Sequence, residues 1–133
     1  MALIQRPHDD ALLVSEEANP SGELFHRPLG GHVEFGEHAL DTVHRELQEE
    51  IGQALTDVRL AGVLENIFQW GGAKQHEIVF VFTAAFADEA AYEIREQVIA
   101  DDRGRARVIW RMPETAGLPL YPEGVAVLAT QVA

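Results

Sequence analysis

The stretch from Leu29 to Gly52, LGGHVEFGEHALDTVHRELQEEIG, constrains the fold more than any other part of the chain. Four of its apolar residues recur at spacings of three and four, which is the stripe of an amphipathic helix. They are Leu40, Val43, Leu47 and Ile51. Gly52 follows the stripe, where a residue in the left-handed conformation ends many helices. The pattern predicts a helix that begins at about Glu37 or His38 and ends at Ile51, with the stripe in the core.

Three glutamates, Glu46, Glu49 and Glu50, project from one side of this helix in its last turns; they are called the glutamate trio below. Like charges at these spacings destabilise a helix by roughly 0.2–0.5 kcal/mol per pair. The helix dipole disfavours each anion near the C-terminus by a further ~0.3–1 kcal/mol. A solvated acidic face would explain the run, but its cost favours a bound cation. Mg²⁺ prefers carboxylate oxygens and keeps several waters, so the trio is a candidate site for it.

The chain has 133 residues, of which 47% are hydrophobic, and this predicts a single domain over residues 1–133. No run of eighteen apolar residues is present, so no membrane span is expected. The first residues, MALIQRPHDDALLV, lack the pattern of a signal peptide. Cysteine is absent, which excludes disulfides and thiolate metal sites. A cytoplasmic location is the expectation.

The net charge of −12 limits the partners of the chain. A long nucleic acid needs a basic track that neutralises its phosphates, and 10 Lys and Arg against 22 Asp and Glu argue against one. A small phosphorylated ligand is compatible with this charge if a metal ion screens it locally.

The remaining pattern favours short strands and one closing helix. Segments expected to be strands are 11–15, 24–26, 58–70, 77–86 and 108–110, and 123–132 is expected to be helical. Gly71-Gly72 predicts a hairpin between the two longest strands. Segment 90–100 is open between helix and strand, and 16–22, 101–105 and 113–122 are expected to be loops. The fold class is α/β (α+β), with a mixed sheet and helices on both of its faces.

The stretch that carries the trio resembles the signature of the Nudix hydrolases, G-x5-E-x7-R-E-U-x-E-E-x-G-U, with U a bulky apolar residue. Gly31, Glu37 and the run from Arg45 to Gly52 match every fixed position. Only the last apolar position differs, since Gln53 occupies it. The resemblance implies the family's α/β/α sandwich and a Mg²⁺-dependent pyrophosphohydrolase, with Mn²⁺ as a substitute. Its substrate would be a nucleoside diphosphate linked to a second group X, such as a nucleotide sugar, ADP-ribose or a nucleoside triphosphate.

The resemblance also implies a role for each matched residue. The glutamate trio would bind the metal, and Arg45 would orient one of the three carboxylates. Glu37 would support the geometry between loop and helix, and Gly31 would permit the tight loop. Arg45 could instead pair with Asp41 on the helix surface, and Glu37 could simply favour the helix dipole.

Outside the signature, several residues are candidates with a plain structural alternative. A further carboxylate could come from Glu77, Asp101 or Asp102, each of which could equally be a solvated acid. Arg27 could reach a phosphate. Gly30, with Gly31 of the signature, is a candidate to bind substrate, although both glycines could be simple turn residues.

The aromatic residues before the hairpin are a second group of candidates. Phe68 and Trp70 could stack on a nucleobase, although aromatic residues of strands are more often core. His76 could reach phosphate or be an exposed residue at a strand end. Tyr121 precedes the closing helix and is assigned no chemistry.

A different class of function also fits the chain. Some Nudix-like domains bind a nucleotide ligand without turnover, and tight binding with no product would favour that reading. The related isopentenyl diphosphate isomerases use a catalytic cysteine, which this chain lacks, and the charge argues against mRNA decapping. Family members are often homodimers, but no apolar patch in the sequence marks an interface.

Overall fold

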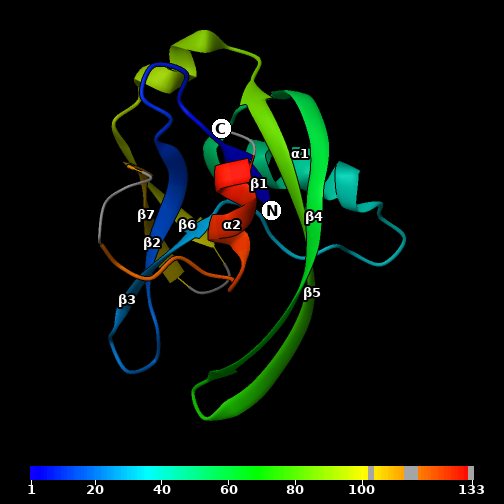
Figure 1. Ribbon diagram of the computed structural model, residues 1–133, viewed down its shortest axis with the longest axis vertical. Helices are drawn as coiled ribbons and strands as arrows, with labels where there is room; N and C mark the ends of the chain where they lie inside the picture. Colours follow the sequence, from blue (N-terminus) through cyan, green and yellow to red (C-terminus); the bar gives the residue numbers. More distant parts are fainter. Residues whose placement is uncertain (102–103, 113–116, 132–133) are drawn as a thin grey trace.

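The computed structural model describes residues 1–101, 104–112 and 117–131 (Figure 1). It contains seven strands, two α-helices and one 3₁₀ segment in this described part of the chain. In chain order they are β1 (Ala2–Ile4), β2 (Leu12–Ala18), β3 (Leu24–Pro28), α1 (Ala39–Ile51), β4 (Leu55–Trp70), β5 (Ala73–Phe86), the 3₁₀ turn Glu89–Glu93, β6 (Glu96–Asp101), β7 (Gly104–Arg111) and α2 (Val125–Gln131). None of the helices described here is long and apolar enough to cross a membrane.

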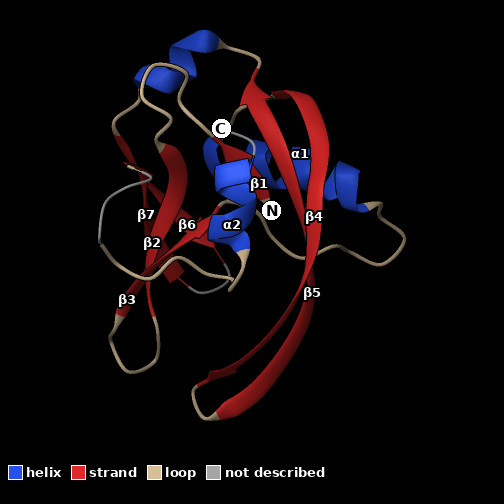
Figure 2. Ribbon diagram, in the orientation of Figure 1, coloured by secondary structure: helices blue, strands red, loops and turns tan. Residues whose placement is uncertain are grey.

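The strands form two sheets (Figure 2). The first has the order β1-β5-β4 and is mixed, because β1 pairs with β5 in parallel and β4 pairs with it antiparallel. The second is antiparallel, with the order β3-β2-β7-β6. The mixed α+β class predicted from the sequence is confirmed, although its strands are divided between two sheets.

The two helices fill the space on opposite faces of the mixed sheet. Val43 and Leu47 of α1 share a buried cluster with Ala2, Ile4 and Phe82 of β1 and β5. A second cluster joins Val125 of α2 to Leu3 and Val81. Successive residues of β1 therefore point to different cores, as the alternation of a strand requires. The prediction that helices cover both faces of a mixed sheet is thus confirmed around β1.

The hairpin of β4 and β5 extends well beyond these cores (Figure 1). The Gly71-Gly72 turn, with φ of 62° and 83°, joins the strands as predicted. Toward the turn, Ile67 and Ile78 are 68% and 55% exposed, whereas Val81 nearer the helices is fully buried. The part of the hairpin toward the turn is not packed into either core. Its residues Glu77 to Phe80 line a cavity opposite α1.

Helix α1 lies within the predicted range and ends as predicted. Gly52 adopts the left-handed conformation (φ 68°, ψ 27°), and its N–H donates to the Gln48 carbonyl. The prediction that Leu40 is core is wrong, because it is 45% exposed. Thr42 is buried in that turn instead. Its hydroxyl can enter the protein because it donates to the Glu37 carboxylate at 2.6 Å.

Other segments differ from the sequence expectation or settle it. β2 runs to Ala18, into the segment 16–22 that was expected to be a loop. β1 was not predicted, since three residues are too short for an alternating pattern. In the segment 101–105, which was expected to be a loop, Asp101 ends β6 and Gly104 begins β7, and the two strands pair as far as these residues. Segment 90–100 resolves into part of the 3₁₀ turn followed by β6. Within 113–122, residues 113–116 lie outside the described part of the chain.

Candidate functional site

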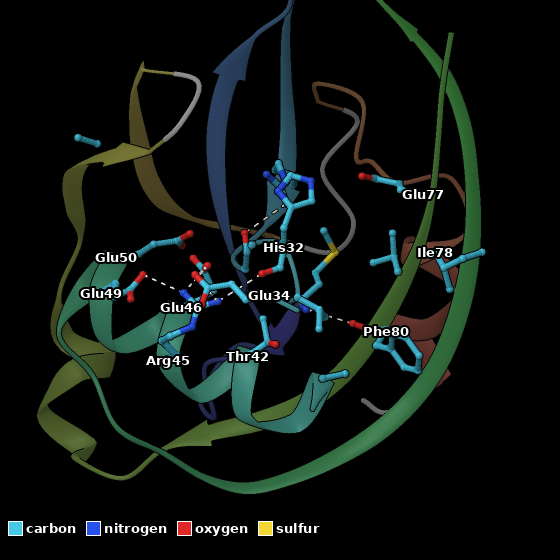
Figure 3. A pocket seen from close by; sticks show the side chains of 18 residues that line it. His32, Glu34, Thr42, Arg45, Glu46, Glu49, Glu50, Glu77, Ile78 and Phe80 are labelled. Atoms are coloured by element: carbon cyan, nitrogen blue, oxygen red, sulfur yellow. Dashed lines mark hydrogen bonds and ion pairs between the residues drawn. The ribbon is translucent and has the colours of Figure 1, made fainter. Parts of the chain in front are cut away.

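The glutamate trio and Arg45 lie on one side of a cavity of about 530 Å³. We call it the acidic cavity. Helix α1 supplies these four side chains, and Glu77, Ile78 and Phe80 of β5 face them from the other side (Figure 3). The loop before α1 adds Gly31, His32 and Glu34. The helical spacing that groups the trio on one face thus brings all three carboxylates to the same cavity.

Arg45 is the hub of the charged side of the acidic cavity. Its guanidinium binds both carboxylate oxygens of Glu37, through Nε at 2.7 Å and Nη2 at 3.0 Å. Nη1 donates to Glu46 at 2.9 Å and to Glu49 at 3.1 Å, and Nη2 also donates to the His32 carbonyl at 3.3 Å. A planar, permanently charged donor is suited to several carboxylates at once. The predicted orienting contact is present, whereas Asp41 is not a partner of Arg45.

Glu37 links the loop to the helix. It accepts from Arg45, from the Thr42 hydroxyl and from the backbone N–H of Glu34 at 3.2 Å. These bonds, above all the one from Arg45, lower the pKa of Glu37 to about 2. The same bond and those to Glu49 and Glu46 raise the pKa of Arg45 above its ordinary value. Glu37 is therefore an anion that fixes Arg45, which agrees with the supporting position predicted for it.

Gly31 is required by the position of Glu46. A Cβ atom on Gly31 would lie 2.4 Å from the Glu46 carboxyl carbon and 2.4–2.5 Å from its two oxygens. No side chain can approach a carboxylate so closely without displacing it. The loop and the helix are thus packed around a Glu46 carboxylate whose side chain is only 16% exposed.

Gly30 makes a second close approach. Its φ is 145°, a conformation that favours glycine. A Cβ there would lie 2.7 Å from the Cα of Met1. Arg27 reaches the same place, because its Nη2 donates to the Gly30 carbonyl at 3.4 Å. The three residues predicted to bind substrate, Arg27, Gly30 and Gly31, all line the acidic cavity.

The trio is not gathered into a preformed set of metal ligands. Within the described ranges, no group of three or more histidine, aspartate or glutamate side chains is placed to hold a metal ion. The physical reason is that Glu46 and Glu49 turn toward Arg45, which supplies the positive charge. The donor set still fits a hard divalent cation, since it consists of carboxylate oxygens on consecutive helical turns in one cavity.

A second cavity of about 240 Å³ adjoins the first. We call it the aromatic cavity. Phe68 and Trp70 line it, together with Phe25 and Tyr121. Phe68 and Trp70 are half-buried and belong to neither core cluster. Glu77 and Arg27 line both cavities, so the aromatic and acidic cavities open toward one another.

Sequence reasoning missed two aromatic residues of this cavity. The ring centroids of Phe25 and Trp70 are 6.0 Å apart with an interplanar angle of 85°, and those of Phe25 and Tyr121 are 5.8 Å apart. Tyr121 is held there by two backbone bonds of β3, from the Tyr121 N–H to the His26 carbonyl and from the His26 N–H to the Pro119 carbonyl. No local signal could reveal a pairing across 95 positions of sequence.

Asn66 was also missed, although a signal for it existed. Asn66, Phe68 and Trp70 alternate along β4 and so share one face of the hairpin. Asn66 stands opposite Glu77 in the strand register, and its amide donates to Glu77 Oε1 at 3.0 Å. The strand period alone would have placed Asn66 with the two aromatic residues.

The remaining candidates lie elsewhere. His76 faces Glu65 at 3.0 Å with its side chain 56% exposed and lines neither cavity, so the exposed reading holds and the phosphate contact is not supported. Glu77 is placed at the cavity but bonds Asn66. Asp101 ends β6, and its side chain, like all of Asp102, lies outside the described part of the chain.

Comparison with known proteins places this geometry in a family. The model of a family described as the NUDIX domain matches residues 1–124. The m7GpppN-mRNA hydrolase NUDT17 of Xenopus laevis is 34% identical over 95 residues, which cover 67% of this chain and 32% of that protein. The human protein of the same name is 28% identical over 127 residues, which cover 87% of this chain and 38% of that protein. The chain spans about a third of the length of these curated relatives.

Proposed function

This chain belongs to the NUDIX domain family, and from that premise we propose that it is a divalent-metal-dependent pyrophosphohydrolase. Its substrate would be a nucleoside diphosphate linked to a second group. The observation that carries the proposal is the meeting of Arg45 and the glutamate trio in one cavity, with Gly31 packed against Glu46.

The charge arrangement supports a role for each of these residues. Glu46, Glu49 and Glu50 would hold Mg²⁺, or Mn²⁺ in its place, through carboxylate oxygens. Such an ion neutralises phosphate charge and lowers the pKa of a bound water. When the ion binds, Arg45, which Glu37 fixes, would release Glu46 and Glu49 to it.

Arg27 and Glu77 bound the path between the two cavities. A pyrophosphate that lies across this path would meet the Arg27 guanidinium, which favours phosphate oxygens. Glu17 lies 3.8 Å from that guanidinium and helps to hold it. Glu77 lies in the same passage, where its carboxylate accepts a hydrogen bond from Asn66. Phe68 and Trp70 would receive the nucleobase by stacking.

The relatives named above hydrolyse capped mRNA, as their name states. A net charge of −12 disfavours contact with a long RNA. We therefore place the substrate among small nucleotides: nucleoside triphosphates, ADP-ribose, nucleotide sugars and dinucleoside polyphosphates. A short cap analogue belongs to the last of these classes and needs no basic track.

One observation favours the competing function, a nucleotide-binding domain without turnover. Glu46 and Glu49 both accept hydrogen bonds from Arg45 Nη1, and no group of three metal-holding side chains is present among the described residues. The two functions predict different outcomes when ligand and metal are both supplied. A domain that only binds a nucleotide can keep the bonds from Arg45 to Glu46 and Glu49. Hydrolysis requires these bonds to break so that the two glutamates can bind the metal.

The test is a panel of these small nucleotides, incubated with the purified chain in Mg²⁺, in Mn²⁺ and in chelator, with products separated by chromatography. We expect one class to be cleaved at its pyrophosphate linkage, and only with metal. Capped RNA and a short cap analogue belong in the same panel. Tight binding of a panel member without product in either metal would establish the competing function.

A further inference from the structure

The aromatic cavity has the composition of a base-binding site. Its wall is formed by aromatic rings on three separate segments, β3, β4 and the residues before α2. Tyr121 is 49% exposed, so the rings are accessible from solvent. Its volume of about 240 Å³ is below the roughly 300–1,000 Å³ of pockets that enclose a whole ligand. The aromatic cavity therefore suits the planar part of a larger molecule.

The position of the cavity indicates which molecule that is. It meets the acidic cavity at Arg27 and Glu77. A nucleotide with its base among the rings would direct its phosphates past Arg27 toward the glutamate trio. This arrangement rests on the function proposed above, but the base contacts themselves require no metal.

Asn66 and Glu77 supply the polar groups of the aromatic cavity on the hairpin. Since Asn66 donates to Glu77 Oε1, the orientation of its amide is fixed and its Oδ1 remains an acceptor. Among the described residues, none donates a hydrogen bond to Glu77 Oε2. The pair thus presents acceptors to a ligand that enters between the rings.

Of the four common bases, only guanine carries two adjacent donors, N1–H and N2–H₂, on its pairing edge. Adenine and cytosine each place an acceptor beside their amino group, and uracil places its single donor between two carbonyl oxygens. A carboxylate accepts bidentately from two adjacent donors and repels a neighbouring acceptor. We propose that the aromatic cavity binds a guanine base, whose Watson–Crick edge is read by Glu77 and Asn66.

The proposal is tested by nucleotide binding in chelator, where no hydrolysis can occur. The chain has two tryptophans, so Trp110→Phe leaves Trp70 as the only indole reporter. Trp110 lines neither cavity and packs against Phe86 and Tyr92. Titration with GMP, 7-methyl-GMP, AMP, CMP and UMP should quench Trp70 fluorescence, with GMP or its methylated form bound roughly tenfold or more tightly than the others.

Glu77→Gln should reduce GMP affinity about tenfold and leave AMP affinity nearly unchanged. Asn66→Ala should reduce the affinity for GMP to a smaller extent. This variant tests the Asn66–Glu77 pair independently if Glu77→Gln fails to fold. The matched control is Glu65→Gln, which changes the adjacent residue of β4 on the opposite face of the hairpin. This control should bind every nucleotide as the Trp110→Phe protein does.

Equal affinity for all four bases, an unchanged GMP affinity in Glu77→Gln, or no quenching by any nucleotide would overturn the proposal. The proposed hydrolysis can fail separately. Selective GMP binding without turnover of any guanine nucleotide in metal would keep the base site and reject the enzyme. Metal-dependent turnover with no preference among bases would keep the enzyme and reject the guanine site.

Discussion

The two walls of the acidic cavity are built in different ways. The helix wall, made of α1 and the loop before it, consists of residues within about twenty positions of one another, joined by the Arg45 hub. The hairpin wall, made of β4 and β5, contacts β3 through the rings of Trp70 and Phe25. Tyr121 is joined to β3 by backbone hydrogen bonds, so this side of the site depends on contacts between segments far apart in the sequence. On the proposed function, the locally encoded helix wall would carry out the reaction, and the hairpin wall, which depends on tertiary contacts, would select the ligand.

The largest effect should follow from a change in the helix wall. Glu50→Gln keeps the size of the side chain and removes its charge, so we expect a folded protein with turnover reduced about 100-fold or more. Steady-state kinetics at saturating metal would measure this. Asp41→Asn, on the first turn of the same helix, is the control and should retain activity. Equal activity of the two variants would remove Glu50 from the site.

A glycine on each wall gives the next test. Gly31→Ala should displace the Glu46 carboxylate and lower turnover about 10- to 100-fold, because the new Cβ would lie 2.4–2.5 Å from it. Gly72→Ala at the hairpin tip meets no atom within 4 Å, but its φ is +83°. That variant should lose about 1 kcal/mol of stability and no activity. Chemical denaturation and kinetics on both variants would show whether the two effects separate in this way.

A change in the hairpin wall should act on substrate binding. Trp70→Ala removes a ring of the aromatic cavity, and we expect KM to rise about tenfold with kcat nearly unchanged. Phe35→Ala is a suitable control, since Phe35 is fully exposed in the loop before α1 and lines neither cavity. A fall in kcat with constant KM would instead place Trp70 in the chemistry.

The smallest effect concerns acid stability. The pKa of Glu37 lies near 2, below its ordinary value of 4.5, chiefly because of Arg45. A lowered folded pKa means that the ionised carboxylate stabilises the fold above about pH 4.5, and that this stabilisation disappears as pH falls toward 2. The stability difference between wild type and Glu37→Gln, measured by urea denaturation, should therefore shrink over this range. A difference independent of pH would contradict the ion pair.

Asp9 offers a matched ion pair outside both walls. Its pKa is also lowered to about 2, mainly by the hydrogen bond from Arg6. Asp9→Asn should show the same acid dependence of stability without loss of turnover, whereas Glu37→Gln should lose turnover as well. Loss of activity in both variants would mean that general destabilisation explains the result.

The two walls also differ in how far the sequence predicted them. The spacing of Arg45, Glu46 and Glu50 on one helix sufficed to place them together, because helical geometry is local. Leu40 was misplaced, since the bond from Thr42 to Glu37 decides which side of the first turn is buried. Phe25 and Tyr121 were beyond reach, because the pairing that joins them spans most of the chain.

The measurement that tests the central claim most directly is hydrolysis by wild-type protein in H₂¹⁸O, with Mg²⁺ and with chelator, on the most rapidly cleaved nucleotide of the panel. A metal-dependent attack of water on phosphorus predicts one ¹⁸O atom in a phosphate product, and product only with metal. Equal turnover in chelator, or bound nucleotide with no ¹⁸O-labelled product in Mg²⁺ or Mn²⁺, would contradict the account.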